Sequence, residues 1–129
     1  MEIAIFENEF DTLEVAFKYL NKKFYDKKLK FINFPRSQSI EEFSDIENYS
    51  LVIIDIDLSA QSELDGFGLI RKIESEIKNI PKILILTGQE LDENYVEENN
   101  LSRKYPILEK PVNYKKIKLE FDKLNIKST

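Results

Sequence analysis

The sequence predicts an α/β fold with a doubly wound parallel sheet, and two observations carry this prediction. Short apolar segments alternate along the chain with longer segments in which apolar residues recur every three or four positions, as in amphipathic helices. Two of the short segments, Leu51–Asp55 and Lys82–Leu86, are nearly continuous runs of Val, Ile and Leu, which is typical of parallel strands covered on both faces. The 129 residues accommodate five such strand and helix units in a single domain, 1–129.

The first two units occupy the N-terminal third of the chain. A strand is expected at Ile3–Phe6, and the helix after it has its apolar face on Leu13, Ala16, Phe17, Leu20 and Phe24. The second strand, Lys30–Phe34, ends at Pro35. A serine-rich cap then leads into a second expected helix, which has Ile40, Phe43 and Ile46 on its inner face.

The other three units follow the same pattern. The segment "LVIID" is the third strand, and "DGFGLIRKIESEIK" is a helix that buries Phe67, Ile70, Ile73 and Ile77. Lys82–Leu86 is the fourth strand, and a short acidic helix is expected around Asp92–Asn99. The segment "PILEKP" contains the fifth strand, and the last helix turns Tyr114, Ile117, Phe121 and Leu124 inward.

The composition excludes several classes of function. The chain has no histidine and no cysteine, so it cannot build a zinc site, a thiol nucleophile or a Ser-His-Asp triad from its own residues. A net charge of −5 argues against direct binding to nucleic acid. No segment has the ~20 apolar residues of a membrane span, and the acidic N-terminus does not resemble a signal peptide, so a cytoplasmic location without membrane contact is expected.

Chemically versatile side chains follow four of the five predicted strands. Glu7, Asn8 and Glu9 follow the first strand, Asp55 ends the third and Asp57 lies two residues beyond it, Thr87 follows the fourth, and Lys110 follows the fifth. In doubly wound sheets, ligands bind at the carboxyl ends of the strands, so these side chains are expected to converge. Carboxylates, a hydroxyl and a lysine suit Mg²⁺ and a phosphoryl group, with an aspartate as nucleophile that forms an acyl phosphate.

In these features the sequence resembles the receiver domains of two-component response regulators, over essentially all of residues 1–129. The matching motifs are "IAIFENE", "LVIID", the "DG" that opens the third helix, "ILILTG" and "EKP". The resemblance implies a flavodoxin-like, five-stranded sheet in the order 2-1-3-4-5 with five helices. Because the chain ends shortly after the last helix, no output domain is expected.

The resemblance also implies a role for each site residue. Asp55 is the phosphoacceptor, Thr87 hydrogen-bonds a phosphoryl oxygen, and Lys110 pairs with the phosphoryl group. Glu7 and Asn8 occupy the two acidic positions of the Mg²⁺ site, which the backbone carbonyl of Asp57 and the carboxylate of Asp55 complete. The expected partner is a histidine kinase or phosphotransfer protein that donates the phosphoryl group from a phosphohistidine. Asp57 and Gln89 border the route of hydrolytic water.

The sequence departs from the family pattern at three places. Asn8 is neutral where a second carboxylate is usual, so Mg²⁺ is expected to bind less tightly. The loop from Asp55 to Gly66 is about three residues longer than is common. The position three residues before Lys110, which commonly holds an aromatic switch, is Ile107, and Tyr105 lies nearby.

Three functions therefore remain open. The domain is a phosphorylatable switch rather than an enzyme, with at most self-phosphorylation and self-dephosphorylation, or a pseudo-receiver that serves as an interaction module without phosphorylation. The third alternative, a haloacid-dehalogenase-type phosphatase, rests on the "DID" of Asp55 to Asp57, because that family also places two aspartates in this way.

For a receiver, the expected output surface combines the acidic fourth helix, the fifth strand and the lysine-rich last helix. Residues 89–100 contain five acidic residues and no basic one, whereas the last segment is rich in lysine. Side by side, these segments would let two copies form a weak, salt-sensitive homodimer about a two-fold axis. Solvated helix surfaces are the simpler interpretation of the same charges.

Overall fold

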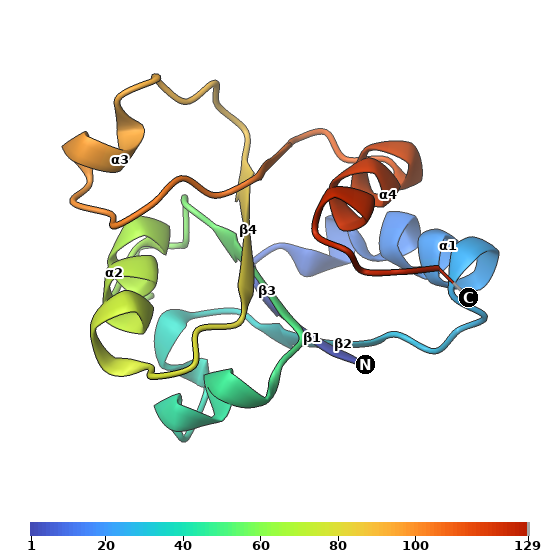
Figure 1. The fold of residues 1–129 in the computed structure, drawn as a ribbon, viewed down its shortest axis with the longest axis horizontal. Coiled ribbons are helices and arrows are strands. Elements are labelled where there is room, and N and C mark those ends of the chain that lie inside the picture. The colour runs from blue at the N-terminus through green and yellow to red at the C-terminus, as the bar shows by residue number, and fades with distance from the viewer. Residues whose placement is uncertain (129) are drawn as a thin grey trace.

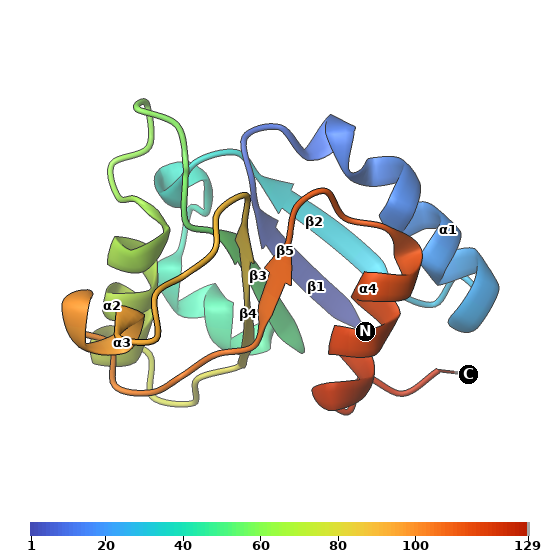
Figure 2. The ribbon, with the colours of Figure 1, turned by 90° about the horizontal axis from the view of Figure 1, so that it is seen from above.

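The computed structural model describes residues 1–128 and contains one five-stranded sheet (Figure 1, Figure 2). All neighbouring strands are parallel, and their order is β2-β1-β3-β4-β5. The predicted fold class and strand order are therefore confirmed. The strands are β1 (Glu2–Phe6), β2 (Lys30–Phe34), β3 (Leu51–Asp55), β4 (Lys82–Thr87) and β5 (Ile107–Glu109).

The central strand β3 explains why its sequence is so apolar. All five of its residues are buried, since β1 and β4 pair with its two edges and helices cover both of its faces. In this register Ile53 lies opposite Ile5 on one side and Leu84 on the other. Polar side chains are therefore accommodated only at the strand's carboxyl end, where Asp55 lies.

Helices cover the sheet in two layers (Figure 1). Helices α1 (Glu14–Phe24) and α4 (Tyr114–Lys123) cover one face, and α2 (Gly66–Glu76) and α3 (Tyr95–Glu98) cover the other. Because side chains alternate along a strand, β1 directs Ile3 toward the α1 and α4 layer and Phe6 toward the α2 and α3 layer.

The connection between β2 and β3 differs from the prediction, which placed an α-helix there. In place of an α-helix, it forms two 3₁₀ helices, η2 (Ser37–Ser39) and η3 (Phe43–Asn48), and another short one, η1 (Phe10–Thr12), precedes α1. Serine hydroxyls compete with backbone groups for hydrogen bonds and so favour turns over long helices. Here the Ser39 hydroxyl accepts a hydrogen bond from the backbone N–H of Arg36, 3.1 Å away. Ile46 is still buried, as the pattern predicted.

The acidic segment and the last helix lie in different layers. Tyr95 of α3 packs in the core shared with α2, whereas Ile117 and Phe121 of α4 pack in the core shared with α1. Figure 1 places α3 and α4 on opposite sides of the sheet, and Figure 2 places them on opposite sides of β5. The expectation that these oppositely charged segments lie side by side is therefore not met. Among residues 1–128, no helix is both long and apolar enough to span a membrane.

Candidate functional site

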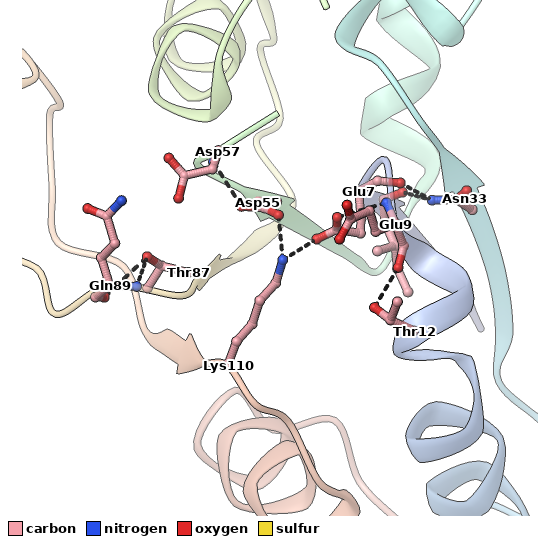
Figure 3. Close-up of polar contacts among 10 residues, drawn as sticks. Glu7, Glu9, Thr12, Asn33, Asp55, Asp57, Thr87, Gln89 and Lys110 are labelled. Atoms are coloured by element: carbon pink, nitrogen blue, oxygen red, sulfur yellow. Dashed lines mark hydrogen bonds and ion pairs between the residues drawn. The ribbon is translucent and has the colours of Figure 1, made fainter. Parts of the chain in front are cut away.

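Four of the predicted site residues lie at the carboxyl edge of the sheet, and the side chains of three of them, Glu7, Asp55 and Lys110, meet there (Figure 3). Glu7 directly follows β1, Asp55 is the last residue of β3, Thr87 is the last of β4, and Lys110 directly follows β5. Glu7, Asp55 and Thr87 are each at most 2% exposed. Burial of two carboxylates at one place requires compensation, because a buried charge without a partner is costly.

Lys110 provides that compensation. Its Nζ atom lies 2.8 Å from Asp55 Oδ2, to which it donates a hydrogen bond, and 2.9 Å from Glu7 Oε2. The backbone N–H of Lys110 donates to the carbonyl of Thr87 at 2.7 Å, so the ladder between β4 and β5 fixes where the lysine side chain starts. Its ammonium group thus bridges the two carboxylates.

The pKa of Asp55 is set by opposing effects. Burial raises it, but hydrogen bonds from Glu7, Lys110 and the backbone N–H of Asp57 outweigh burial and hold the pKa below its usual value. The Asp57 N–H donates to Asp55 Oδ1 at 2.8 Å. For Lys110 the carboxylates likewise outweigh burial, so its pKa is raised and it stays charged. Asp55 is therefore an ionised carboxylate at neutral pH.

Glu7 is the less well compensated carboxyl group. Burial, together with its contact with Asp55, raises the pKa of Glu7 to about 7. Its Oε1 atom accepts a hydrogen bond from the backbone N–H of Glu9 at 2.9 Å. Within residues 1–128, its Oε2 atom receives no hydrogen bond of good geometry, although Lys110 Nζ is near. The pocket thus has an acceptor oxygen with spare capacity.

Asn33 supports this edge of the pocket and was not singled out from the sequence. Its side-chain amide donates to the carbonyl of Glu7 at 2.9 Å and to the carbonyl of Ile5 at 3.1 Å (Figure 3). The turn after β1 is thereby fastened to β2. An asparagine within the apolar strand Lys30–Phe34 was the signal that could have revealed it.

The other candidate side chains lie apart from the two carboxylates. The Thr87 hydroxyl is engaged with its own turn, where it accepts from the backbone N–H of Gln89 at 3.0 Å. The Asp57 carboxylate is exposed and extends away from Asp55, and Gln89 is exposed as well (Figure 3). Asn8 is exposed and lines a hollow of about 610 Å³ with Pro35, Arg36 and residues 59–61.

The donor set fits a small hard cation. Glu7 and Asp55 offer carboxylate oxygens and Asp57 a backbone carbonyl, and oxygen ligands of this kind suit Mg²⁺. Burial raises the pKa of Glu7 even though Lys110 Nζ lies 2.9 Å from its Oε2 atom, so a cation bound here would stabilise the ionised form of this carboxyl group. Among the described residues, no three acidic side chains come together as a metal site, which is consistent with Asn8 at the position of the usual second acid.

The long loop after Asp55 is held by hydrogen bonds to η2, a feature not predicted from the sequence. The buried Ser37 hydroxyl accepts from the backbone N–H of Leu64 and from the Ser62 hydroxyl, each at 3.0 Å. The Ser62 hydroxyl in turn accepts from the Ser37 N–H at 2.9 Å, and Gln38 bonds the loop backbone at Gln61 and Glu63. We call these contacts the Ser37 clasp.

Tyr105 is held away from the pocket by hydrogen bonds to α2 and α3. It is buried and its hydroxyl donates to Glu74 of α2, while its backbone N–H donates to the Tyr95 hydroxyl at 3.0 Å. Ile107 is partly buried against the same core. Among residues 1–128, neither side chain makes a polar contact with Thr87.

Scans against protein-family models and against curated proteins found no match to this sequence. Among solved structures, the beryllofluoride-activated receiver domain of Klebsiella pneumoniae RstA is similar, with 23% identity, a TM-score of 0.69, and coverage of 97% of this chain and 99% of that one.

Two further receiver domains are similar at full length. One is the magnesium-bound receiver of the sensor histidine kinase PA1611 from Pseudomonas aeruginosa, with 18% identity, a TM-score of 0.70 and coverage of 95% of each chain. The other is a CheY-like receiver from Methylobacillus flagellatus, with 16% identity, a TM-score of 0.70, and coverage of 97% and 98%. Together with the sheet order, these matches show that the chain has the fold of response-regulator receiver domains.

Proposed function

We propose that this chain is a two-component receiver in which Asp55 accepts a phosphoryl group. The observation that carries the proposal is the arrangement of Asp55, Glu7 and Lys110: a buried, ionised carboxylate lies 2.8 Å from a lysine ammonium that also lies 2.9 Å from the buried carboxyl group of Glu7. An ionised aspartate can act as a nucleophile, and the lysine can neutralise charge on the incoming phosphoryl oxygens.

The reaction is a transfer between two covalent carriers. A carboxylate oxygen of Asp55 attacks the phosphorus of a phosphohistidine on a partner protein, and an acyl phosphate bond forms. The bond between phosphorus and the imidazole nitrogen breaks, and its electron pair stays on the nitrogen. Mg²⁺ held by Glu7, Asp55 and the Asp57 carbonyl would supply further positive charge for the phosphoryl oxygens. The chain is thus a phosphoacceptor rather than a conventional enzyme.

In this proposal, Thr87, Asp57 and Gln89 act after the phosphoryl group has been transferred to Asp55. Asp55 pairs with Leu86 in the sheet, and the buried Thr87 is the next residue of β4, so its hydroxyl can leave the turn and donate to a phosphoryl oxygen. Asp57 and Gln89 are exposed and lie two residues beyond Asp55 and Thr87, where their side chains would orient a water molecule for hydrolysis. An acyl phosphate of modest lifetime follows from two polar side chains at this position.

The proposed partners are a histidine kinase or phosphotransfer protein as donor and a downstream protein that reads the surface of α3, β5 and α4. Rearrangement of Thr87 would be transmitted to the segment between β4 and α3, which directly follows it. The weak homodimer expected through this surface required α3 and α4 to lie side by side, and they lie in different layers, so a two-fold contact is not part of this proposal. The PA1611 receiver, which belongs to a sensor kinase and holds magnesium in its cleft, supports both the donor class and the metal.

The test is intact-mass spectrometry after incubation with Mg²⁺ and acetyl phosphate. The wild-type chain is expected to gain one phosphoryl mass, Asp55→Asn none, and the exposed-site control Asp57→Asn one. Absence of the added mass on the wild-type chain, with Mg²⁺ bound, would overturn the proposal.

A pseudo-receiver is the second candidate, and the position of Asn8 favours it. Asn8 is exposed and neutral, and Lys110 already pairs both carboxylates without any metal. In that case the fold serves as an interaction module, and the wild-type chain remains unmodified in the same assay. The phosphatase alternative fits less well, since only the backbone of Asp57, not its carboxylate, contacts Asp55.

A further inference from the structure

Charge is segregated between the two layers that cover the sheet. The segments that form and flank α1 and α4, residues 10–30 and 111–128, contain eleven lysines and five acidic residues. The segments of the opposite layer, residues 35–50, 56–80 and 88–106, contain fourteen acidic and six basic residues. We call these the basic layer and the acidic layer. A protein with a net charge of only −5 is therefore strongly dipolar.

Much of this charge is free for an external partner. Of the described residues, only four lysines of the basic layer form ion pairs within the chain: Lys18, Lys30, Lys118 and Lys123. Over the same residues 1–128, no acidic residue of the acidic layer takes part in an ion pair. Unpaired charges of one sign on one surface attract the opposite surface of another molecule and repel their own kind.

The basic layer presents an apolar side chain in the middle of its lysines. Leu119 of α4 is 56% exposed, and Lys115, Lys116, Asp122 and Lys123 lie three or four residues from it, on the same side of the helix. Within residues 1–128, Lys118 pairs with Asp122 and Glu120 pairs with Lys123, so Lys115 and Lys116 are the lysines of this group without an ion pair. An exposed leucine flanked by the unpaired Lys115 and Lys116 is suited to a hollow with an apolar floor and an acidic rim.

The acidic layer contains such a hollow, of about 250 Å³. The buried Ile40 and Leu69 and the half-buried Phe43 contribute apolar surface, and the exposed Glu41 and Glu63 contribute negative charge. Lys72 also lines it, but its ammonium group lies over the Phe43 ring, 4.2 Å from the ring centre.

We propose that this chain associates head to tail, with Leu119 and the lysines of α4 of one copy seated in the hollow formed by Ile40, Phe43 and Leu69 of the next. A two-fold axis pairs a surface with itself and would bring lysines against lysines here, whereas a head-to-tail contact joins opposite charges and leaves one free surface at each end. The occupant is a second copy because the chain itself carries both complementary surfaces. The contact does not involve Asp55, so it is independent of the proposed phosphorylation.

Sedimentation velocity at low salt, over a wide range of protein concentration, tests this. The average mass is expected to rise past that of a dimer as concentration increases, and to fall to the monomer when salt screens the charges. Lys115→Glu/Lys116→Glu and Glu41→Lys/Glu63→Lys should each be monomeric alone, while an equimolar mixture of the two associates again. Acidic residues in the first turn of α4 also favour the helix dipole, so the first variant is expected to fold.

A matched variant distinguishes the effect of losing the proposed contact from the effect of a changed net charge. Lys78→Glu/Arg103→Glu changes the net charge by the same amount as Lys115→Glu/Lys116→Glu, but in the acidic layer, and should associate at least as strongly as the wild type. Leu119→Ser should weaken association at equal net charge. A monomer at every concentration and salt, a mass that saturates at a dimer, or a mixture of the two reversed variants that stays monomeric would each overturn the proposal.

Discussion

Gly66 lies directly against the backbone of Asp55. A Cβ atom added at Gly66 would lie 2.3 Å from the carbonyl oxygen of Asp55 and 2.3 Å from the Cα atom of Ile56. The backbone N–H of Gly66 also donates to the carbonyl of Ile56 at 3.2 Å. The first turn of α2 therefore packs on the residue that carries the proposed acceptor carboxylate.

Replacement of Gly66 by alanine should destabilise the fold and disturb the pocket together. Both clashing groups are backbone atoms, which cannot rotate away, so an overpacking cost of about 1–3 kcal/mol is expected. Urea unfolding measures it. Gly88→Ala is the matched control, because a Cβ atom at Gly88 would meet nothing within 4 Å. Equal stability of the two variants would contradict this account.

The strands and the pocket could be predicted because each depends on local sequence. Continuous apolar runs specified the strands, and polar residues at their ends specified Glu7, Asp55, Thr87 and Lys110 as neighbours once the strands are parallel. The pairing of Lys110 with both carboxylates could not be predicted, since it depends on the side-chain conformation at the end of β5.

The parts that could not be predicted depend on contacts distant in sequence. The second crossover forms 3₁₀ helices, and Ser37 bonds Ser62 and Leu64 across 25 to 27 residues. A serine-rich stretch indicates turns but not their partners. Likewise, Asn8 occupies the expected position in the motif "IAIFENE", but it is exposed and lines a hollow with Arg36. No local sequence pattern indicates that neighbour.

The raised pKa of Glu7 predicts a pH-dependent penalty on stability in the absence of divalent cations. The group has a pKa of about 7 in the folded chain against an ordinary value of 4.5, so between these values the folded state holds a proton that the unfolded state releases. Stability therefore falls as pH rises from about 4.5 to 7, by up to about 3 kcal/mol from this group.

Glu7→Gln removes this titration and should become progressively more stable than the wild type over the same pH range, as urea unfolding in EDTA would show. The exposed neighbour variant Glu9→Gln serves as the control and should follow the wild type. If Glu7→Gln and the wild type lose stability in parallel, the carboxyl group is not the cause.

Asn8→Asp should tighten Mg²⁺ binding if position 8 turns toward the pocket when the metal is bound. A third carboxylate adds attraction for the cation, and a roughly tenfold gain in affinity corresponds to about 1.4 kcal/mol, a modest value for a charge added at a partly exposed site. Isothermal titration calorimetry measures it, with Glu9→Asp as a control that leaves the charge unchanged. An unchanged affinity would show that this side chain stays with Arg36 in the outer hollow.

The Ser37 clasp should restrain the loop that carries Asp57. Ser37→Ala leaves the Leu64 N–H without its acceptor, at a cost of about 1 kcal/mol for a part-buried hydrogen bond, whereas the Ser62 hydroxyl keeps the Leu64 carbonyl as its acceptor. Beyond this loss of stability, the amide of Leu64 should exchange with solvent faster than amides of the central strand, which report global unfolding. Hydrogen exchange with peptide-level mass spectrometry distinguishes the two, and Ser44→Ala, at an exposed serine in η3, is the control. Protection at Leu64 that falls only in step with β3 would mean that the clasp contributes to overall stability without restraining the loop locally.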